Sequence, residues 1–243
     1  MKIANDFKYV FQMQLFRSIG PLMFFTVIQI FMSLGIIVGF RYLFDDLDNQ
    51  SLLYLATGAP TFILVLTGLV ILPMQIGNAK IEGYVEFTRT WPVNRGVIIG
   101  ADTSIWLGVT IPGLCIATLF AHLMFNPGYD ISWTVIPALL LIALTSIGVG
   151  YGFSYLFPQD VTFAVSQFIA FGALMFSPLN FPIERLPEWF QAVHHILPFH
   201  SMAEVMRASL AASTFEASVW NYVTLSVWCM VGYGGAIWIL NRK

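Results

Sequence analysis

Residues 52–76 read LLYLATGAPTFILVLTGLVILPMQI, a stretch without a single Asp, Glu, Lys or Arg. An α-helix rises about 1.5 Å per residue and the hydrocarbon core of a bilayer is about 30 Å thick, so a helix of this length can cross it. Five further stretches are uncharged or nearly so: Ile19–Phe40, Val97–Phe125, Trp133–Phe157, Val161–Phe181 and Val219–Leu240. The sequence therefore predicts an all-α integral membrane protein with six transmembrane helices.

The composition agrees with a membrane protein and argues against other classes. Hydrophobic residues make up 58% of the chain and charged residues 10%, with a mean hydropathy of +0.77, whereas soluble domains carry about 25% charged residues. The formal net charge is −2, so we expect no nucleic-acid partner, which would need a clustered basic surface. Cys115 and Cys229 lie in apolar stretches, which favours small buried side chains over a disulfide framework.

The distribution of Lys and Arg predicts the orientation, because positive residues near transmembrane helices stay on the cytoplasmic side. With six spans, one side carries Lys2, Lys8, Arg17, Lys80, Arg89, Arg95, Arg242 and Lys243. The opposite side carries Arg41, Arg185 and Arg207. We therefore expect a multi-pass protein of a bacterial-type inner membrane, with both termini in the cytoplasm.

Residues 1–18 have the pattern of an amphipathic helix. The apolar residues that recur at helical spacing are Ile3, Phe7, Val10, Phe11 and Leu15. We expect this connecting helix to lie in the membrane interface, with Lys8 and Arg17 available to lipid phosphates. An ordinary juxtamembrane anchor would have the same pattern.

The cytoplasmic loop at residues 79–96 is both charged and aromatic. Its charged residues are Lys80, Glu82, Glu86, Arg89 and Arg95, and its large aromatic residues are Tyr84, Phe87 and Trp91. Charged residues steer encounters and aromatic residues anchor interfaces. The composition therefore suits docking to a cytoplasmic partner as well as it suits a solvated turn.

The segment at residues 182–218 is hydrophobic, but prolines divide it into pieces too short to span the membrane. Pro187 suits the first turn of a helix over Glu188–Leu197, and Ser201 with Glu204 forms a capping box for a second helix. We predict a re-entrant helical hairpin that dips back from the outer face before the last span. Non-helical backbone at membrane depth must be buried or line a cavity, so this hairpin should cover something.

Glycines and phenylalanines suggest how the spans pack. Gly35 with Gly39, and Gly148 with Gly152, place small residues four apart, which is typical of helices that approach closely within or between subunits. The candidates for the wall of an apolar cavity are Phe24, Phe31, Phe168 and Phe171. Contact with lipid or with the protein core is the alternative for these rings.

No motif for catalysis is present. The chain lacks the G-x-x-x-x-G-K-[ST] phosphate loop, H-E-x-x-H and G-x-S-x-G, so we expect no nucleotide, metal or enzymatic site of its own. The alternative, a membrane-embedded metal-binding protein or enzyme, would use Glu188, His194, His195, His200 and Glu204. Adjacent His194 and His195 point to different sides of a helix, which disfavours one shared ion.

Ionisable residues inside the predicted spans are few, and they argue against ion-coupled transport. Asp102 and His122 lie on the same span, about 30 Å apart along a helix. Each would lie near an opposite interface, so they cannot pair with each other.

Two stretches resemble the membrane subunits of ABC exporters, the ABC type-2 transporter permease family. Glu82-Gly83-Tyr84-Val85-Glu86-Phe87, followed by Trp91-Pro92-Val93, is similar to the family's E-x-G-T-x-E-x-L…P-V run, with Tyr84 in place of the usual Thr. Pro182 to Pro187, then Leu197-Pro198 and Arg207, resembles the hairpin that precedes the family's last span. Asp102 stands where a Lys is common in the family.

The resemblance implies a six-span domain over residues 19–243 that works with separate subunits. Residues that would couple the chain to an ABC ATPase are Glu82, Gly83, Tyr84, Glu86, Phe87 and Arg89; those of the outer hairpin are Pro182, Leu186, Pro187, Pro198 and Arg207. The ATPase would hold ATP and Mg, and this chain would bind no cofactor. Further partners would be membrane lipid and a second copy or a sister permease. The implied function is ATP-driven export of a hydrophobic or amphipathic substrate such as a drug, peptide or lipid-like molecule.

Overall fold

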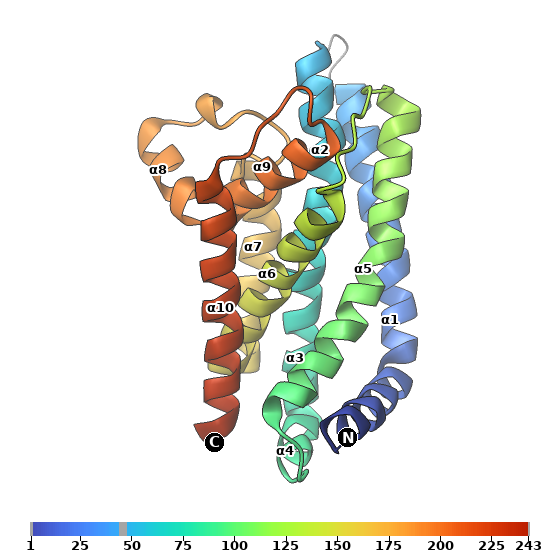
Figure 1. Cartoon of the computed structure of the whole chain (residues 1–243), viewed down its shortest axis with the longest axis vertical. Coiled ribbons are helices and arrows are strands. Elements are labelled where there is room, and N and C mark those ends of the chain that lie inside the picture. Colours follow the sequence, from blue (N-terminus) through green and yellow to red (C-terminus); the bar gives the residue numbers. More distant parts are fainter. Residues whose placement is uncertain (1, 44–47, 243) are drawn as a thin grey trace.

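The structure, a computed structural model, describes residues 2–43 and 48–242, and within these ranges the chain is a bundle of helices (Figure 1). The elements are α1 (Lys2–Leu43), α2 (Asn49–Leu66), the π-helix η1 (Thr67–Ile71), α3 (Leu72–Ile81), α4 (Tyr84–Arg89), α5 (Arg95–Phe125), α6 (Val135–Leu156), α7 (Gln159–Phe176), the 3₁₀-helix η2 (Ile183–Arg185), α8 (Glu188–Ile196), α9 (Pro198–Leu210) and α10 (Val219–Arg242). The described residues contain no β-strand.

Six helical stretches in the described part of the chain are long and apolar enough to cross a membrane, which confirms the predicted fold class. They are Ile3–Gly39, Asn49–Ile81, Arg95–Phe125, Val135–Leu156, Gln159–Phe176 and Val219–Arg242. The fifth is shorter than the predicted span, which reached Phe181. It stops at Phe176 because Ser177 adopts extended backbone, the conformation favoured by a residue that precedes a proline.

The two ends of the bundle differ in what they carry. The two chain ends lie at the same end as α4, and α8 lies at the opposite end (Figure 1). We call these the α4 end and the α8 end. The predicted topology, with an even number of spans and the hairpin opposite the termini, agrees with this arrangement.

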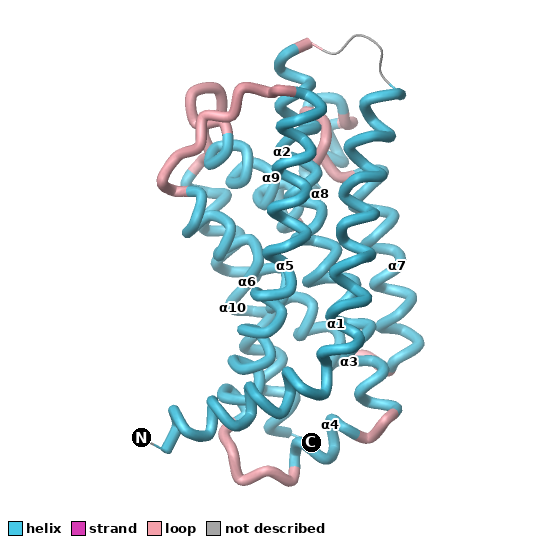
Figure 2. The backbone as a smooth tube through the Cα atoms, turned by 90° about the vertical axis from the view of Figure 1, so that its right-hand side faces the viewer, coloured by secondary structure: helices cyan, strands magenta, loops and turns pink. Residues whose placement is uncertain are grey.

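The predicted helix at residues 1–18 is the first part of α1 and not a separate element. Figure 2 shows that this part turns away from the direction of the span. Pro21 lies inside α1, and a proline in a helix removes one backbone hydrogen bond and favours a bend. Val10 is buried against Ile98 and Ala101 of α5. Packing on α5 therefore accounts for part of the apolar face, and its location in the membrane interface stays a prediction.

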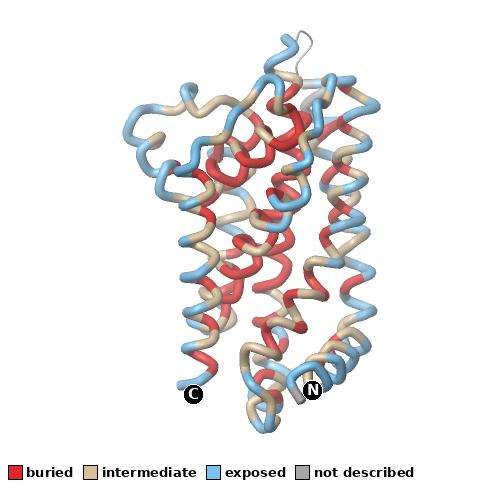
Figure 3. The backbone as a smooth tube through the Cα atoms, in the orientation of Figure 1, coloured by how far each residue is buried: buried red, intermediate tan, exposed pale blue. Residues whose placement is uncertain are grey.

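The second span forms the centre of the bundle. Its most apolar part is entirely buried, as the colouring of α2 and α3 in Figure 3 indicates. Pro60 in α2 cannot donate a hydrogen bond to the Ala56 carbonyl four residues earlier. The Tyr129 hydroxyl donates to this carbonyl at 2.9 Å, so a residue from the α5–α6 connection satisfies the acceptor that Pro60 leaves open.

Glycines allow direct backbone contact between α6 and α10. A Cβ at Gly232 would come within 2.3 Å of the Gly148 carbonyl carbon, and one at Gly152 within 3.3 Å of Gly232. Close packing of the fourth span is therefore confirmed. A Cβ at Gly35 or Gly39 would meet nothing within 4 Å, so no described residue of this chain packs closely on that pair.

The hairpin consists of two helices, as predicted, but the second begins earlier than expected. Pro198 is the first residue of α9 and no side chain caps its N-terminus. Ser201 is hydrogen-bonded to Asn221 of α10 at 3.2 Å and Glu204 pairs with Arg207. The predicted capping box is therefore wrong, because a proline suits the first turn directly, Ser201 binds a residue of another helix, and Glu204 binds Arg207 one turn further along α9.

Candidate functional site

The coupling segment, residues 79–96, has a defined shape at the α4 end. α3 stops at Ile81, and Gly83 adopts φ +70°, a left-handed conformation that glycine tolerates best. The chain then reverses into α4. Asn94 caps α5 by accepting a hydrogen bond from the Gly96 N–H at 2.8 Å. The segment is thus a short helix held between two spans.

Aromatic rings hold the coupling segment together. The Tyr84, Phe87 and Trp91 rings lie with centroids 5.6 to 6.4 Å apart, mostly edge to face, the geometry that aromatic pairs prefer. The Arg95 guanidinium donates to the Thr88 carbonyl at 3.1 Å and to the Arg89 carbonyl at 2.7 Å. These contacts give the segment a defined shape, and its docking to a partner stays a prediction.

The exposed surface of α4 combines charge with an apolar side chain. The Arg89 guanidinium binds both carboxylate oxygens of Glu86 at 2.7 Å, and the Glu86 side chain is 69% exposed. Phe87 is also exposed. An exposed aromatic residue beside charged groups is the composition of a protein contact surface.

Arg17 of α1 connects the bent N-terminal part to the coupling segment. Its guanidinium forms an ion pair with Glu82 and lies 3.6 Å from the centroid of the Tyr84 ring, a cation–π distance. Burial raises the pKa of the Tyr84 hydroxyl, and the positive charge of Arg17 opposes this shift. The Arg17 side chain stays 36% exposed, so its expected role in lipid binding stays a prediction. The sequence showed Arg17 only as a basic residue next to a predicted span, and no pattern in it predicted the contacts with Glu82 and Tyr84.

Lys80 connects the coupling segment to α6. Its ammonium group donates to the Phe157 carbonyl at 2.7 Å and to the Ser154 carbonyl. Carbonyls at the end of a helix have no intrahelical partner, and a cation is favoured there. The sequence placed Lys80 among the positive residues that set the orientation and among the charged residues of the loop, but it did not predict these contacts.

A polar cavity of about 70 Å³ lies behind the coupling segment and is lined by α1, α3, α4, α5 and α6. Its polar lining residues include Gln14, Arg17, Gln75, Tyr84 and Asp102. The Tyr151 hydroxyl donates to the Asp102 carboxylate at 2.7 Å. Asp102 is therefore paired within its own chain, as polar groups inside a membrane usually are.

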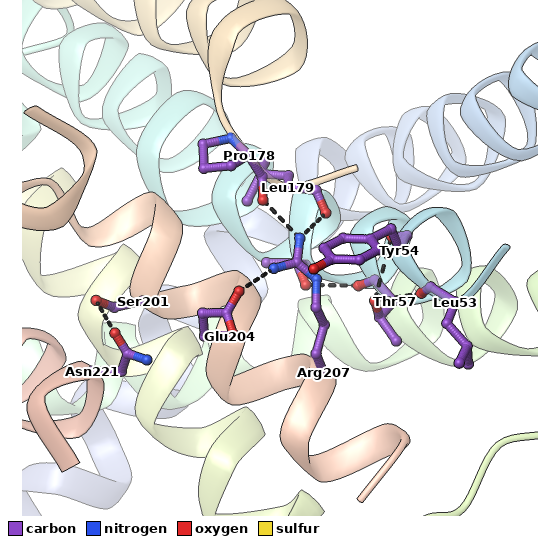
Figure 4. A network of polar contacts seen from close by, with 10 residues as sticks. Leu53, Tyr54, Thr57, Pro178, Leu179, Ser201, Glu204, Arg207 and Asn221 are labelled. Atoms are coloured by element: carbon purple, nitrogen blue, oxygen red, sulfur yellow. Dashed lines mark hydrogen bonds and ion pairs between the residues drawn. The ribbon is translucent and has the colours of Figure 1, made fainter. Parts of the chain in front are cut away.

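At the α8 end, Arg207 is the centre of a buried polar network (Figure 4). Its side chain is 1% exposed, and Nη1 lies 2.5 Å from Glu204. Nη2 donates to the carbonyls of Pro178 at 2.7 Å and Leu179 at 2.8 Å, and the guanidinium lies 4.3 Å from the centroid of the Tyr54 ring. Arg207 thus joins α9 to α2 and to the segment that follows α7.

The predicted hairpin prolines mark the boundaries of its helices. Pro182 precedes η2, Pro187 precedes α8 and Pro198 opens α9. The Leu186 carbonyl accepts a hydrogen bond from Gln191 at 2.7 Å. These residues shape the hairpin, and Arg207 fixes it to the bundle. Re-entry of the hairpin into the membrane stays a prediction.

The histidines of the hairpin do not form a metal centre. His194 is buried beside the Phe190 ring, whereas His195 is exposed and lies against His200, with ring centroids 5.1 Å apart. In the described ranges, no three His, Cys, Asp or Glu residues are placed to hold a metal ion. Burial lowers the pKa of His200 to about 4. These residues therefore give no geometric support to the metal-binding alternative.

The four phenylalanines proposed for a cavity lie on α1 and α7 and face outward. Phe24, Phe31, Phe168 and Phe171 are between 63% and 79% exposed. The larger apolar grooves are lined by other residues, one of about 590 Å³ between α5, α6 and α9 and one of about 470 Å³ between α8 and α10. A role for these rings in a substrate path would require a second chain.

Comparison with known proteins agrees with this geometry. A family model described as ABC-2 type transporter matches residues 7–211, which include the coupling segment and Arg207. No curated protein matches the chain. Because the family match covers most of the sequence, the chain belongs to the ABC-2 type transporter family and is a multi-pass membrane protein, the permease subunit of an ABC transporter.

Proposed function

We propose that the chain is the permease of an ATP-driven exporter that moves a hydrophobic or amphipathic substrate out of the cytoplasm or the inner leaflet. The coupling segment is the observation that carries this proposal. It presents Glu86 and Phe87 outward, and it is tied to α1 through Arg17 and to α6 through Lys80. A displacement of α4 would therefore act on several spans together.

The partner that would move α4 is a separate ABC ATPase, which would hold ATP and Mg. Closure of two ATPase subunits on ATP would press on the coupling segment, and the bent part of α1 would follow because Arg17 binds Glu82. For this motion to drive transport, the substrate must bind the two states of the permease with different affinity.

The α4 end would face the cytoplasm of a bacterial-type inner membrane. The two chain ends and α4 share this end (Figure 1), and most Lys and Arg residues of the loops and termini belong to it. Positive residues stay on the cytoplasmic side. The hairpin would then lie outside.

A second copy of the chain, or a sister permease, would complete the path. α1 and α7 have room for a neighbour. Within the described residues, a Cβ at Gly35 or Gly39 would meet nothing within 4 Å, and Phe24 and Phe168 are exposed. Small residues allow helices of two subunits to approach closely. Aromatic rings on such faces would give the path between the chains an apolar wall, which suits an apolar substrate.

The test is purification of the tagged chain from its native membrane in mild detergent, followed by mass spectrometry and an ATPase assay. We expect a stoichiometric ABC ATPase whose ATP hydrolysis falls several-fold with Glu82→Ala and Glu86→Ala. Glu216→Ala, an exposed acid at the α8 end, is the control and should leave the rate unchanged. Absence of an ATPase from the folded, purified chain would contradict the proposal.

A further inference from the structure

The central span is not a continuous α-helix. η1 interrupts it at Thr67–Ile71, where the Leu72 N–H donates to the Thr67 carbonyl five residues earlier. A π-helical turn inserts an extra residue into an α-helix, and such turns are rare and frequent at functional sites. The interruption lies between α2, which leads to the α8 end, and α3, which leads to the coupling segment.

Local chemistry explains why the interruption occurs here. Pro73 has no N–H, so in a regular α-helix the Leu69 carbonyl would have no donor four residues ahead. Gly68 and Gly150 of α6 are in backbone contact, since a Cβ at Gly150 would come within 2.0 Å of the Gly68 oxygen. The π-turn thus lies where the backbones of the central span and α6 are in contact.

The two halves of the central span pack against different helices. α2 packs mainly against α5, α9 and α1, whereas α3 packs mainly against α7, α6 and α4. Tyr54 of α2 also contacts Arg207 of the hairpin. The partners therefore change at η1, which separates a half held by the hairpin from a half attached to the coupling segment.

We propose that η1 is a hinge about which α3 tilts together with α4, while α2 stays held by α5 and the hairpin. The inference deepens the proposed function, on which it rests, because ATP-driven displacement of α4 is the motion that the hinge would admit. α3 is about 15 Å long, and π-turns are among the few places where helices kink by more than about 20°. A tilt of this size would displace its Ile81 end by about 5 Å.

The test measures distances between spin labels on the chain together with its co-purified ATPase in lipid nanodiscs, with Cys115 and Cys229 changed to Ala. One pair, at Ile81→Cys and Asn241→Cys, reports the end of α3 against α10. The second pair, at Gln50→Cys and Leu123→Cys, reports α2 against α5. All four positions are exposed. On addition of ATP and vanadate, we expect the first distance to change by about 5 Å and the second to stay constant.

A variant without the π-turn tests whether the ATP-dependent movement of α3 requires it. Deletion of Val70 with Pro73→Ala would restore a regular helix without rotating α3 relative to α2, and the ATP-dependent change at Ile81 should disappear. Val70→Ala and Pro73→Ala are the matched controls, because each keeps the extra residue and should keep the change.

The outcomes separate the hinge from the proposed function. The hinge is overturned if both label pairs move together, if neither moves while the ATPase hydrolyses ATP, or if the deletion variant behaves like the wild type. If the deletion variant does not fold, the two wild-type distances still decide. If no ATPase co-purifies, the proposed function fails. The hinge is then tested on the isolated chain. There, the distribution of the Ile81–Asn241 distance should be broader in the wild type than in the deletion variant, and equal widths would overturn the hinge.

Discussion

Arg207→Met should destabilise the chain more than most single substitutions. The guanidinium is almost fully buried and donates to Glu204 and to two backbone carbonyls. Methionine has a similar length but no donor, so the substitution would leave a carboxylate and two carbonyls without their partner. Removing one member of a buried ion pair costs about 3–5 kcal/mol. For a chain of this length, such a loss corresponds to a fall of roughly 10 °C in Tm.

The assay is thermal unfolding in lipid nanodiscs, followed by intrinsic tryptophan fluorescence. Arg185→Met is the matched control, because Arg185 lies on the same hairpin but is exposed, and it should change the free energy of unfolding by less than about 0.5 kcal/mol. Adding Glu204→Gln to Arg207→Met should recover about 1–2 kcal/mol, since an unpaired and only partly exposed charge is then removed. A loss in Arg207→Met no larger than that of the control would refute the role given to this network.

Three further substitutions or conditions test other contacts by the same unfolding measurement. Tyr129→Phe should cost about 1 kcal/mol, because the Ala56 carbonyl loses its donor; an unchanged Tm would contradict this. Gly232→Ala should cost roughly 1–3 kcal/mol, because the new methyl group would overlap Gly148, and a neutral result would disprove the contact. Burial lowers the pKa of His200 to about 4, so stability should fall as pH drops from about 6.5 towards 4, and less so in His200→Gln.

The spans could be predicted because charge is excluded from the membrane, and the sequence displays this directly. Stretches with at most one Asp, Glu, Lys or Arg located all six. Proline was equally informative for α8, which begins after Pro187 as expected. The start of α9 was placed too late because Ser201 and Glu204 fit a local capping pattern. In the structure Ser201 binds Asn221 of α10, and Glu204 binds Arg207 of α9 itself.

The contacts that organise the candidate site could not be predicted, because they join residues far apart in the chain. Arg17 meets Glu82 and Arg207 meets Tyr54, and no spacing pattern marks either pair. The π-turn has a local signal in Pro73, but most prolines in helices produce ordinary bends. Its position also depends on the contact between Gly68 and Gly150, which only the packed bundle reveals.

The shared location of the chain ends and α4 determines how a partner could be attached by design. A domain fused to either terminus emerges at the same end of the bundle as the coupling segment (Figure 1). A flexible Gly/Ser linker of n residues spans about 5–6 Å × √n, and a short linker of this kind gives effective concentrations in the millimolar range. An ATPase that binds α4 only weakly would therefore occupy it almost fully once tethered, and a bulky tag at either terminus would compete for the same space.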